Sequence, residues 1–279
     1  MIKFFGWLIF ILILIYIVIC LLIFFFQERF LFFPQKLPAD THFTFPYKFE
    51  EFFIEAEDGV RLNGLLFKSA GSEYRSGSLS GMARGLVFYL HGNAGALNNW
   101  GYAADEFLGE GFDVFILDYR GYGKSEGNIS SQNQLLNDVE LAFQEVSKLY
   151  QAQEIIITGY SIGTGPACWL ASRHPVDKLL LIAPFYNLTD LANHYFPFLP
   201  SFILRYPLKN NQYLEKVEAP VTLIHGKNDE IIPHESSLRL KDAVKKDVNL
   251  FILDGLGHNN ITGSLQFRKV IREVLKEKE

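Results

Sequence analysis

The sequence predicts an α/β fold, in which a mostly parallel sheet is covered by helices on both faces and one apolar helix precedes it. Buried-type strands alternate with amphipathic helices over most of the chain, which is the pattern of such sheets. Hydrophobic residues make up 49% of the 279 residues and charged residues 20%, a composition that excludes a disordered chain. The length suits one large domain or two small ones.

The first element is an apolar segment at residues 4–26, which contains no charged side chain. As a helix it would measure about 34 Å, enough to cross a hydrocarbon layer of about 30 Å. A cleaved signal peptide has a shorter apolar region and a small-x-small cleavage site, which is missing here, and a buried core helix is the other alternative. We therefore expect residues 1–28 to be a retained single-pass anchor that contacts the bilayer through residues 4–26. Charges flank the segment on both sides, so the positive-inside rule assigns no orientation.

A connector at residues 29–48 follows the anchor. Its apolar stretch Phe30–Phe33 is expected either in the headgroup region or packed on the domain. Three prolines, Pro34, Pro38 and Pro46, predict an extended chain for the rest of the connector.

Residues 49–279 form the predicted catalytic domain. It opens with a hairpin, and residues 70–84, rich in Gly and Ser, predict a flexible surface loop. The aromatic and proline-punctuated residues 184–212 interrupt the alternation and are expected to form a short cap insertion. Eight strands are predicted, at 52–56, 60–67, 85–90, 114–117, 154–158, 178–182, 221–225 and 250–253. Helices are predicted at 97–110, 131–150, 162–173, 235–246 and from about 262.

Two G-x-S-x-G matches compete for the role of nucleophile. Ligands of parallel sheets bind at the carboxyl ends of the strands, so the position of each serine relative to a strand separates the two matches. Ser161 follows a strand closely and opens a helix among small residues, as a strained strand-to-helix turn requires. Ser125 lies in a Gly-rich loop with no strand immediately before it. We predict Ser161 as the nucleophile; the alternative is a serine that only hydrogen-bonds within a tight turn.

A serine needs a base, and the base needs an acid to orient it. His258 lies in a Gly-flanked loop after the last strand and is the predicted general base. Asp229 follows the penultimate strand and is the predicted acid, with Glu230 and Asp254 as rivals. The chain order of serine, aspartate and histidine is the one expected of this sheet architecture.

An oxyanion requires two preorganised N–H donors. We predict the backbone N–H of Ile162, directly after the nucleophile, and the backbone N–H of Asn93 in the loop after the 85–90 strand. In the same loop His91 is expected to be a structural polar anchor, and His225 is expected to close its strand.

Other classes of function are disfavoured. The net charge is −5 and no basic run occurs, so no nucleic-acid partner is expected. Cys20 and Cys168 lie in different contexts, and no H-E-x-x-H pair occurs, so neither a disulfide nor a metal site nor a cofactor is expected.

Together these segments resemble the α/β-hydrolase superfamily, and within it the membrane-anchored abhydrolase-domain serine hydrolases, over about residues 30–275. The resemblance implies the α/β-hydrolase fold, and activity on esters, on thioesters of acylated proteins or on lipids. The matching segments are Phe32–Pro34, His91–Gly95, Asp118–Gly127, Gly159–Gly163, His225–Asp229 and Gly257–His258.

The expected function is a membrane-tethered serine hydrolase that cleaves acyl-bearing carboxylic esters or thioesters through an acyl-enzyme. A serine peptidase on the same fold and a catalytically silent membrane scaffold are the alternatives. Apolar side chains of the insertion are expected either to line an acyl groove or to cover the sheet edge: Tyr186, Tyr195, Phe196, Phe198, Leu199, Phe202 and Leu204.

Overall fold

The computed structural model describes residues 2–69, 74–75, 78–79, 83–150, 153–244 and 247–276. Most of the predicted 70–84 loop lies outside these ranges. Two short paired strands, β4 (Tyr74–Arg75) and β5 (Ser78–Leu79), are its only described elements.

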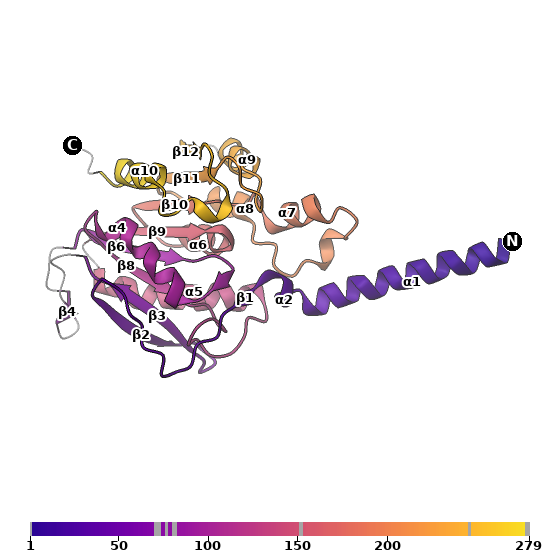
Figure 1. The fold of residues 1–279 in the computed structure, drawn as a ribbon, viewed down its shortest axis with the longest axis horizontal. Coiled ribbons are helices and arrows are strands. Elements are labelled where there is room, and N and C mark those ends of the chain that lie inside the picture. The colour runs from indigo at the N-terminus through magenta and orange to yellow at the C-terminus, as the bar shows by residue number, and fades with distance from the viewer. Residues whose placement is uncertain are drawn as a thin grey trace.

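An eight-stranded sheet forms the centre of the domain, and this confirms the predicted fold class (Figure 1). Its order is β12-β11-β10-β9-β6-β8-β3-β2, with the pairs β2·β3 and β3·β8 antiparallel and the others parallel. The strands are β2 (Phe49–Glu55), β3 (Arg61–Phe67), β6 (Gly85–Leu90), β8 (Phe112–Leu117), β9 (Glu154–Tyr160), β10 (Lys178–Ile182), β11 (Val221–Gly226) and β12 (Val248–Leu253).

Helices cover both faces of the sheet and enclose two separate apolar clusters. One face carries α5 (Gln132–Ser147), α6 (Thr164–Ala171), α8 (Asn210–Leu214) and α9 (Glu235–Ala243). The other carries α3 (Leu97–Trp100), η1 (Gly101–Ala104), α4 (Asp105–Leu108) and α10 (Leu265–Leu275). The single helix predicted at 97–110 is therefore wrong in detail, because the chain there forms three short helical turns. Gly101 lies among them in close contact with Phe45, since a Cβ at Gly101 would lie 2.3 Å from the Phe45 ring.

At the N-terminus, α1 (Ile2–Phe26) projects away from the domain as one continuous helix (Figure 1). It is long and apolar enough to cross a membrane, and its apolar window is not buried in the protein. A core helix buries its apolar surface against other elements, so α1 is not a core helix.

The connector forms α2 (Glu28–Leu31) and β1 (Phe33–Pro34), and β1 pairs with β7 (Ala94–Gly95). Part of the apolar stretch packs on the domain, as one of the two predictions expects. Phe32 is buried, with its ring 5.3 Å from that of Tyr206, whereas Phe30 and Phe33 are exposed.

The cap insertion contains α7 (Leu188–Tyr195), η4 (Ser201–Ile203) and α8, and it lies beside the domain end of α1 (Figure 1). The Tyr16 hydroxyl donates a hydrogen bond of 2.7 Å to the Phe198 carbonyl, and the Gln27 side chain donates one of 3.1 Å to the Ile203 carbonyl. Of the apolar side chains named above, Tyr186 and Leu204 pack against the core, while Tyr195, Phe196, Phe198 and Phe202 are exposed.

Candidate active site

A sharp turn connects β9 to η3 (Ser161–Gly163) and α6, and Ser161 lies at its apex. The φ of Ser161 is 54°, in the left-handed region that residues other than glycine rarely adopt. The turn requires glycine on both sides of Ser161. A Cβ on Gly159 would lie 2.6 Å from the Gly163 carbonyl oxygen, and one on Gly163 would lie 2.1 Å from that of Leu90. This is the strained strand-to-helix turn that the sequence predicts at Ser161.

The structure brings together the three side chains predicted as nucleophile, base and acid. The His258 Nε2 lies 3.0 Å from the Ser161 Oγ, and the His258 Nδ1 lies 2.7 Å from the Asp229 Oδ2. All three side chains are almost completely removed from solvent. They come from loops after β9, β11 and β12, at the carboxyl edge of the sheet, and the geometry is that of a relay from serine through histidine to aspartate.

Asp229 is held in an environment that favours its ionised form. Burial raises the pKa of this carboxyl. Hydrogen bonds from His225, His258 and the Ile232 N–H outweigh the effect of burial, so that the pKa of Asp229 lies well below the usual range. The Oδ1 accepts the N–H groups of Ile231 at 2.9 Å and Ile232 at 2.7 Å. Oδ2 is thereby left to face the imidazole of His258.

Sequence reasoning missed one contact of this carboxylate. His225 does end a strand, as predicted, but its Nε2 also lies 3.2 Å from the Asp229 Oδ2 and 2.9 Å from the Ile232 carbonyl oxygen. Both partners are acceptors, so Nε2 carries the proton, and Nδ1 accepts from the Ser237 hydroxyl at 2.7 Å. The separation of four residues between His225 and Asp229, across a tight turn, is the signal that could have suggested this contact.

The two rivals of Asp229 have other roles. The Glu230 Oε2 accepts the backbone N–H of His258 at 3.2 Å, and the Tyr160 hydroxyl donates to the backbone carbonyl of His258. Asp254 is 79% exposed and pairs with Lys227 at 2.7 Å. Glu230 and Tyr160 therefore hold the backbone of the His258 loop, and Asp254 lies on the surface.

Ser125, in the second motif match, has the contacts of a structural residue. Its buried hydroxyl donates to the Asp118 carbonyl at 2.7 Å and accepts the Asn63 N–H at 2.8 Å. His91 is also fully buried. Its Nδ1 lies 2.7 Å from the Gly92 carbonyl oxygen, and its ring stacks on Trp100.

Of the two predicted oxyanion donors, Ile162 follows Ser161 directly and Asn93 lies in the adjacent loop. A Cβ on Gly92 would lie 3.1 Å from the Tyr160 ring, so this loop packs closely against the turn. Within the described part of the chain, neither backbone N–H has a hydrogen-bond acceptor. The Asn93 carbonyl is fixed by the Phe33 N–H at 2.8 Å and the Tyr122 hydroxyl at 2.7 Å. Both N–H groups are free for a ligand oxygen.

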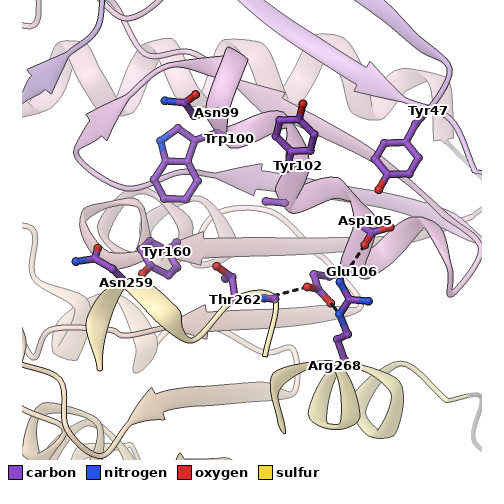
Figure 2. A pocket seen from close by; sticks show the side chains of 12 residues that line it. Tyr47, Asn99, Trp100, Tyr102, Asp105, Glu106, Tyr160, Asn259, Thr262 and Arg268 are labelled. Atoms are coloured by element: carbon purple, nitrogen blue, oxygen red, sulfur yellow. Dashed lines mark hydrogen bonds and ion pairs between the residues drawn. The ribbon is translucent and has the colours of Figure 1, made fainter. Parts of the chain in front are cut away.

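A cavity of about 460 Å³, which no sequence pattern predicts, adjoins the His258 loop. In Figure 2 Tyr160 and Asn259 line one end, near Trp100, and three charged side chains line the other. There Arg268 lies 3.1 Å from Asp105 and 3.4 Å from Glu106. Over the described ranges of the chain, no cluster of three or more His, Cys, Asp or Glu side chains suits a metal ion.

Comparisons with known proteins identify the family of the chain. A family model described as serine aminopeptidase, S33, matches residues 81–213. An uncharacterized protein of Mycobacterium tuberculosis is 30% identical over 239 residues, which cover 84% of this chain and 81% of that protein. Alpha/beta hydrolase domain-containing protein 17B of Homo sapiens is 29% identical over 201 residues, or 70% of this chain and 67% of that protein. The chain belongs to the α/β-hydrolase superfamily.

Solved structures place this α/β-hydrolase in the same fold. An esterase of Pyrococcus furiosus superposes with a TM-score of 0.67 at 19% identity, covering 88% of this chain and 96% of the esterase. An alpha-beta serine hydrolase homologue from Coxiella burnetii gives a TM-score of 0.63 at 17% identity, covering 85% and 100%. The predicted resemblance to abhydrolase-domain proteins is therefore confirmed, and the chain is a hydrolase.

Proposed function

We propose that this protein is a membrane-tethered serine hydrolase that cleaves acyl-bearing carboxylic esters or thioesters through an acyl-enzyme. The single observation that carries the proposal is the chain of contacts from the Ser161 Oγ through the His258 imidazole to the Asp229 carboxylate, at 3.0 Å and 2.7 Å. The positive φ of Ser161 supports it, because a strained apex is tolerated where function requires the side chain to project.

The chemistry follows from these positions. The Nε2 of His258 accepts the Ser161 proton as Oγ attacks the substrate carbonyl carbon, and Asp229 stabilises the imidazolium that forms. The N–H groups of Ile162 and Asn93 would donate to the developing oxyanion. His258 then protonates the leaving alcohol or thiol, and a water molecule, activated by the same histidine, releases the acid and restores Ser161.

The tether is the second part of the proposal. Helix α1 is the membrane-spanning candidate, and Gln27 at its end is buried in the cap. The Gln27 Oε1 accepts the Arg205 N–H at 2.8 Å, and Glu28 pairs with the Arg205 guanidinium at 2.8 Å. These contacts support a helix that stays with the mature domain over one removed as a leader.

A fluorophosphonate probe tests the nucleophile. We expect labelling of the full-length protein in detergent and no labelling of Ser161→Ala, while Ser125→Ala, the matched variant in the second motif match, remains labelled. A catalytically silent scaffold would leave all three proteins unlabelled. Labelling that is lost in Ser125→Ala and kept in Ser161→Ala would refute the assignment.

A serine peptidase is the second candidate, and the description of the matching family model favours it. Asp105 and Glu106 line the cavity beside Tyr160, where carboxylates could hold a substrate amine, but Arg268 already pairs with both. We therefore rank it second. Rates for a nitrophenyl ester, a thioester and an aminoacyl nitroanilide, each corrected with Ser161→Ala, distinguish the two. A higher rate for the anilide would favour the peptidase.

A further inference from the structure

The cap carries an apolar protrusion, residues 196–202, that we call the cap tip. Its phenylalanines Phe196, Phe198 and Phe202 are 51%, 62% and 85% exposed. The segment contains no charged residue and two prolines. Contiguous apolar surface of this kind marks an interaction site, because water-facing surfaces rarely gather large apolar side chains in one place.

The hydrogen bond from Tyr16 to the Phe198 carbonyl fixes the position of the cap tip along α1. Tyr16 lies ten residues before Phe26, which is about 15 Å along the helix axis. Phe198 therefore lies beside the middle of the apolar helix, whereas Ile203, directly after the cap tip, lies at the end of the helix, where its carbonyl accepts from Gln27. The bond from Tyr16 also satisfies the only hydroxyl of the 4–26 segment, a group that would be costly to leave unpaired in hydrocarbon.

The length of α1 decides which solvent surrounds the cap tip. If the cap tip stayed in water, the membrane could begin only beyond Tyr16. Only the apolar residues 4–15, which follow Lys3, would then be left to span it, and their length of about 18 Å falls short of a hydrocarbon layer of about 30 Å. Helix α1 can span a bilayer only if the cap tip enters the same hydrocarbon layer.

Polar residues mark the level at which this layer would end. Gln27 and Glu28 follow α1 directly, and Arg205 and Tyr206 follow the cap tip. Glu28 accepts the Tyr206 hydroxyl at 2.8 Å and pairs with Arg205 at the same distance. The two segments thus change from apolar to charged together, as expected where both leave a membrane at one interface.

Hydrogen bonds from two residues, one in the cap and one in the connector, reach the predicted catalytic loops. The Tyr195 hydroxyl donates to the backbone carbonyl oxygens of Glu230 at 3.2 Å and Ile231 at 2.9 Å, directly after the acid Asp229. The Phe33 N–H donates to the Asn93 carbonyl in the predicted oxyanion loop. Both loops are therefore joined to segments that adjoin the cap tip or α1.

We propose that the cap tip is a membrane-inserted surface, whose partner is the hydrocarbon of the leaflet nearest the catalytic domain. Resting on the function proposed above, the inference also names the substrate class: an ester or thioester whose acyl chain lies in the bilayer. The cap tip and Phe33 would bring the site to the interface, where the carbonyl of such a substrate lies.

The depth of the cap tip can be measured without any activity. The full chain is reconstituted into phosphatidylcholine nanodiscs whose lipids are brominated near the headgroup, midway along the acyl chain or near its methyl end. Bromine quenches a tryptophan that it contacts. Phe202→Trp and Leu265→Trp are made in a Trp7→Phe background, whose remaining tryptophans set the baseline. Leu265 is a matched control, because it is 86% exposed but lies on α10, away from α1 (Figure 1).

We expect bromolipid to quench the added fluorescence of Phe202→Trp and acrylamide in water to quench that of Leu265→Trp. Equal acrylamide quenching of both variants, without bromolipid quenching, would overturn the inference. Trp7 of the unaltered chain reports on α1 itself, and its failure to respond to bromolipid would overturn the inference as well.

The substrate class is tested by a ratio of rates, which separates its failure from that of the hydrolase proposal. Turnover of a long-chain nitrophenyl ester in phosphatidylcholine vesicles is divided by turnover of nitrophenyl acetate in water. We expect Phe202→Asp to lower this ratio about tenfold, because a charge is costly in hydrocarbon, and Leu265→Asp to leave it unchanged. An unchanged ratio in Phe202→Asp would refute the substrate class, whereas absence of both activities in the unaltered protein would refute the proposed hydrolase.

Discussion

Replacing Asp229 with asparagine should invert the tautomer of His258. The Oδ1 of Asp229 accepts two backbone N–H groups, from Ile231 and Ile232, and only an oxygen can do so. The amide nitrogen of Asp229→Asn must therefore take the place of Oδ2, 2.7 Å from the His258 Nδ1. As a donor it forces the imidazole proton onto Nε2, the atom that faces the Ser161 Oγ and must accept its proton.

The expected loss in kcat is about 10⁴-fold, the magnitude known when a triad histidine is held in the wrong tautomer. This corresponds to about 5 kcal/mol of transition-state stabilisation. The assay is kcat for a soluble nitrophenyl ester, with circular dichroism as a check on folding. Asp254→Asn is the matched control, because Asp254 is a rival acid of the same type whose exposed carboxylate pairs with Lys227 on the surface.

The reasoning is refuted if Asp229→Asn retains more than about a tenth of kcat, a loss of only about 1.4 kcal/mol. It is equally refuted if Asp254→Asn has the larger effect. Ser161→Ala supplies an additional test. Residues that act as one unit are strongly non-additive, so adding Asp229→Asn to Ser161→Ala should cause little further loss.

Three further predictions concern stability and the anchor. Ser161→Gly should be more stable than Ser161→Ala by about 0.5–1 kcal/mol in calorimetry. The left-handed φ costs alanine about 1–2 kcal/mol, and the backbone entropy that glycine loses on folding offsets only part of this difference. Equal melting temperatures of the two variants would contradict this prediction. The pKa of Asp229 is depressed in the folded protein, so the ionised carboxylate should stabilise the fold above the pKa of the unfolded chain, about 4, and this stabilisation should be lost as pH falls below that value. The difference in unfolding free energy between Asp229→Asn and the unaltered protein should therefore shrink below that pH. Deleting residues 3–25 should leave soluble-ester turnover, whereas deleting residues 3–34 should lower it, because β1 then no longer supports the Asn93 loop.

The predicted fold and the meeting of the three predicted side chains could both be read from local patterns. Short segments of the sequence show the strand lengths and the glycine spacing. They also show that each of three strands is followed by one of the residues Ser161, Asp229 and His258. A parallel sheet then places the ends of these strands on one edge, so the spatial proximity follows from topology alone. The choice of Asp229 over Glu230 depended on one residue of register, and the turn after β11 settles which carboxylate points at the imidazole.

The features that could not be predicted are contacts between segments far apart in sequence. Nothing in the pattern around Tyr16 indicates that its hydroxyl meets Phe198, and nothing around Gln27 indicates that it is buried against Arg205. Helix α1 ends at Phe26, the last residue of the predicted apolar segment, and the next two residues, Gln27 and Glu28, bond to the cap. A hydropathy pattern finds where apolar residues stop, but it contains no information on tertiary partners.

These long-range contacts explain why the anchor and the cap should be treated as one unit. Glycines such as Gly159 and Gly163 allow the close packing of the turn at Ser161. Two of the other predicted catalytic loops are bonded to Tyr195 of the cap and to Phe33 of the connector. The cap in turn is held by α1 through Tyr16 and Gln27. The contacts of α1 therefore reach the backbone beside Asp229 through the cap, whereas the contact with Asn93 comes from the connector. If α1 spans a membrane as proposed above, this series of hydrogen bonds connects the bilayer to the backbone beside the predicted acid.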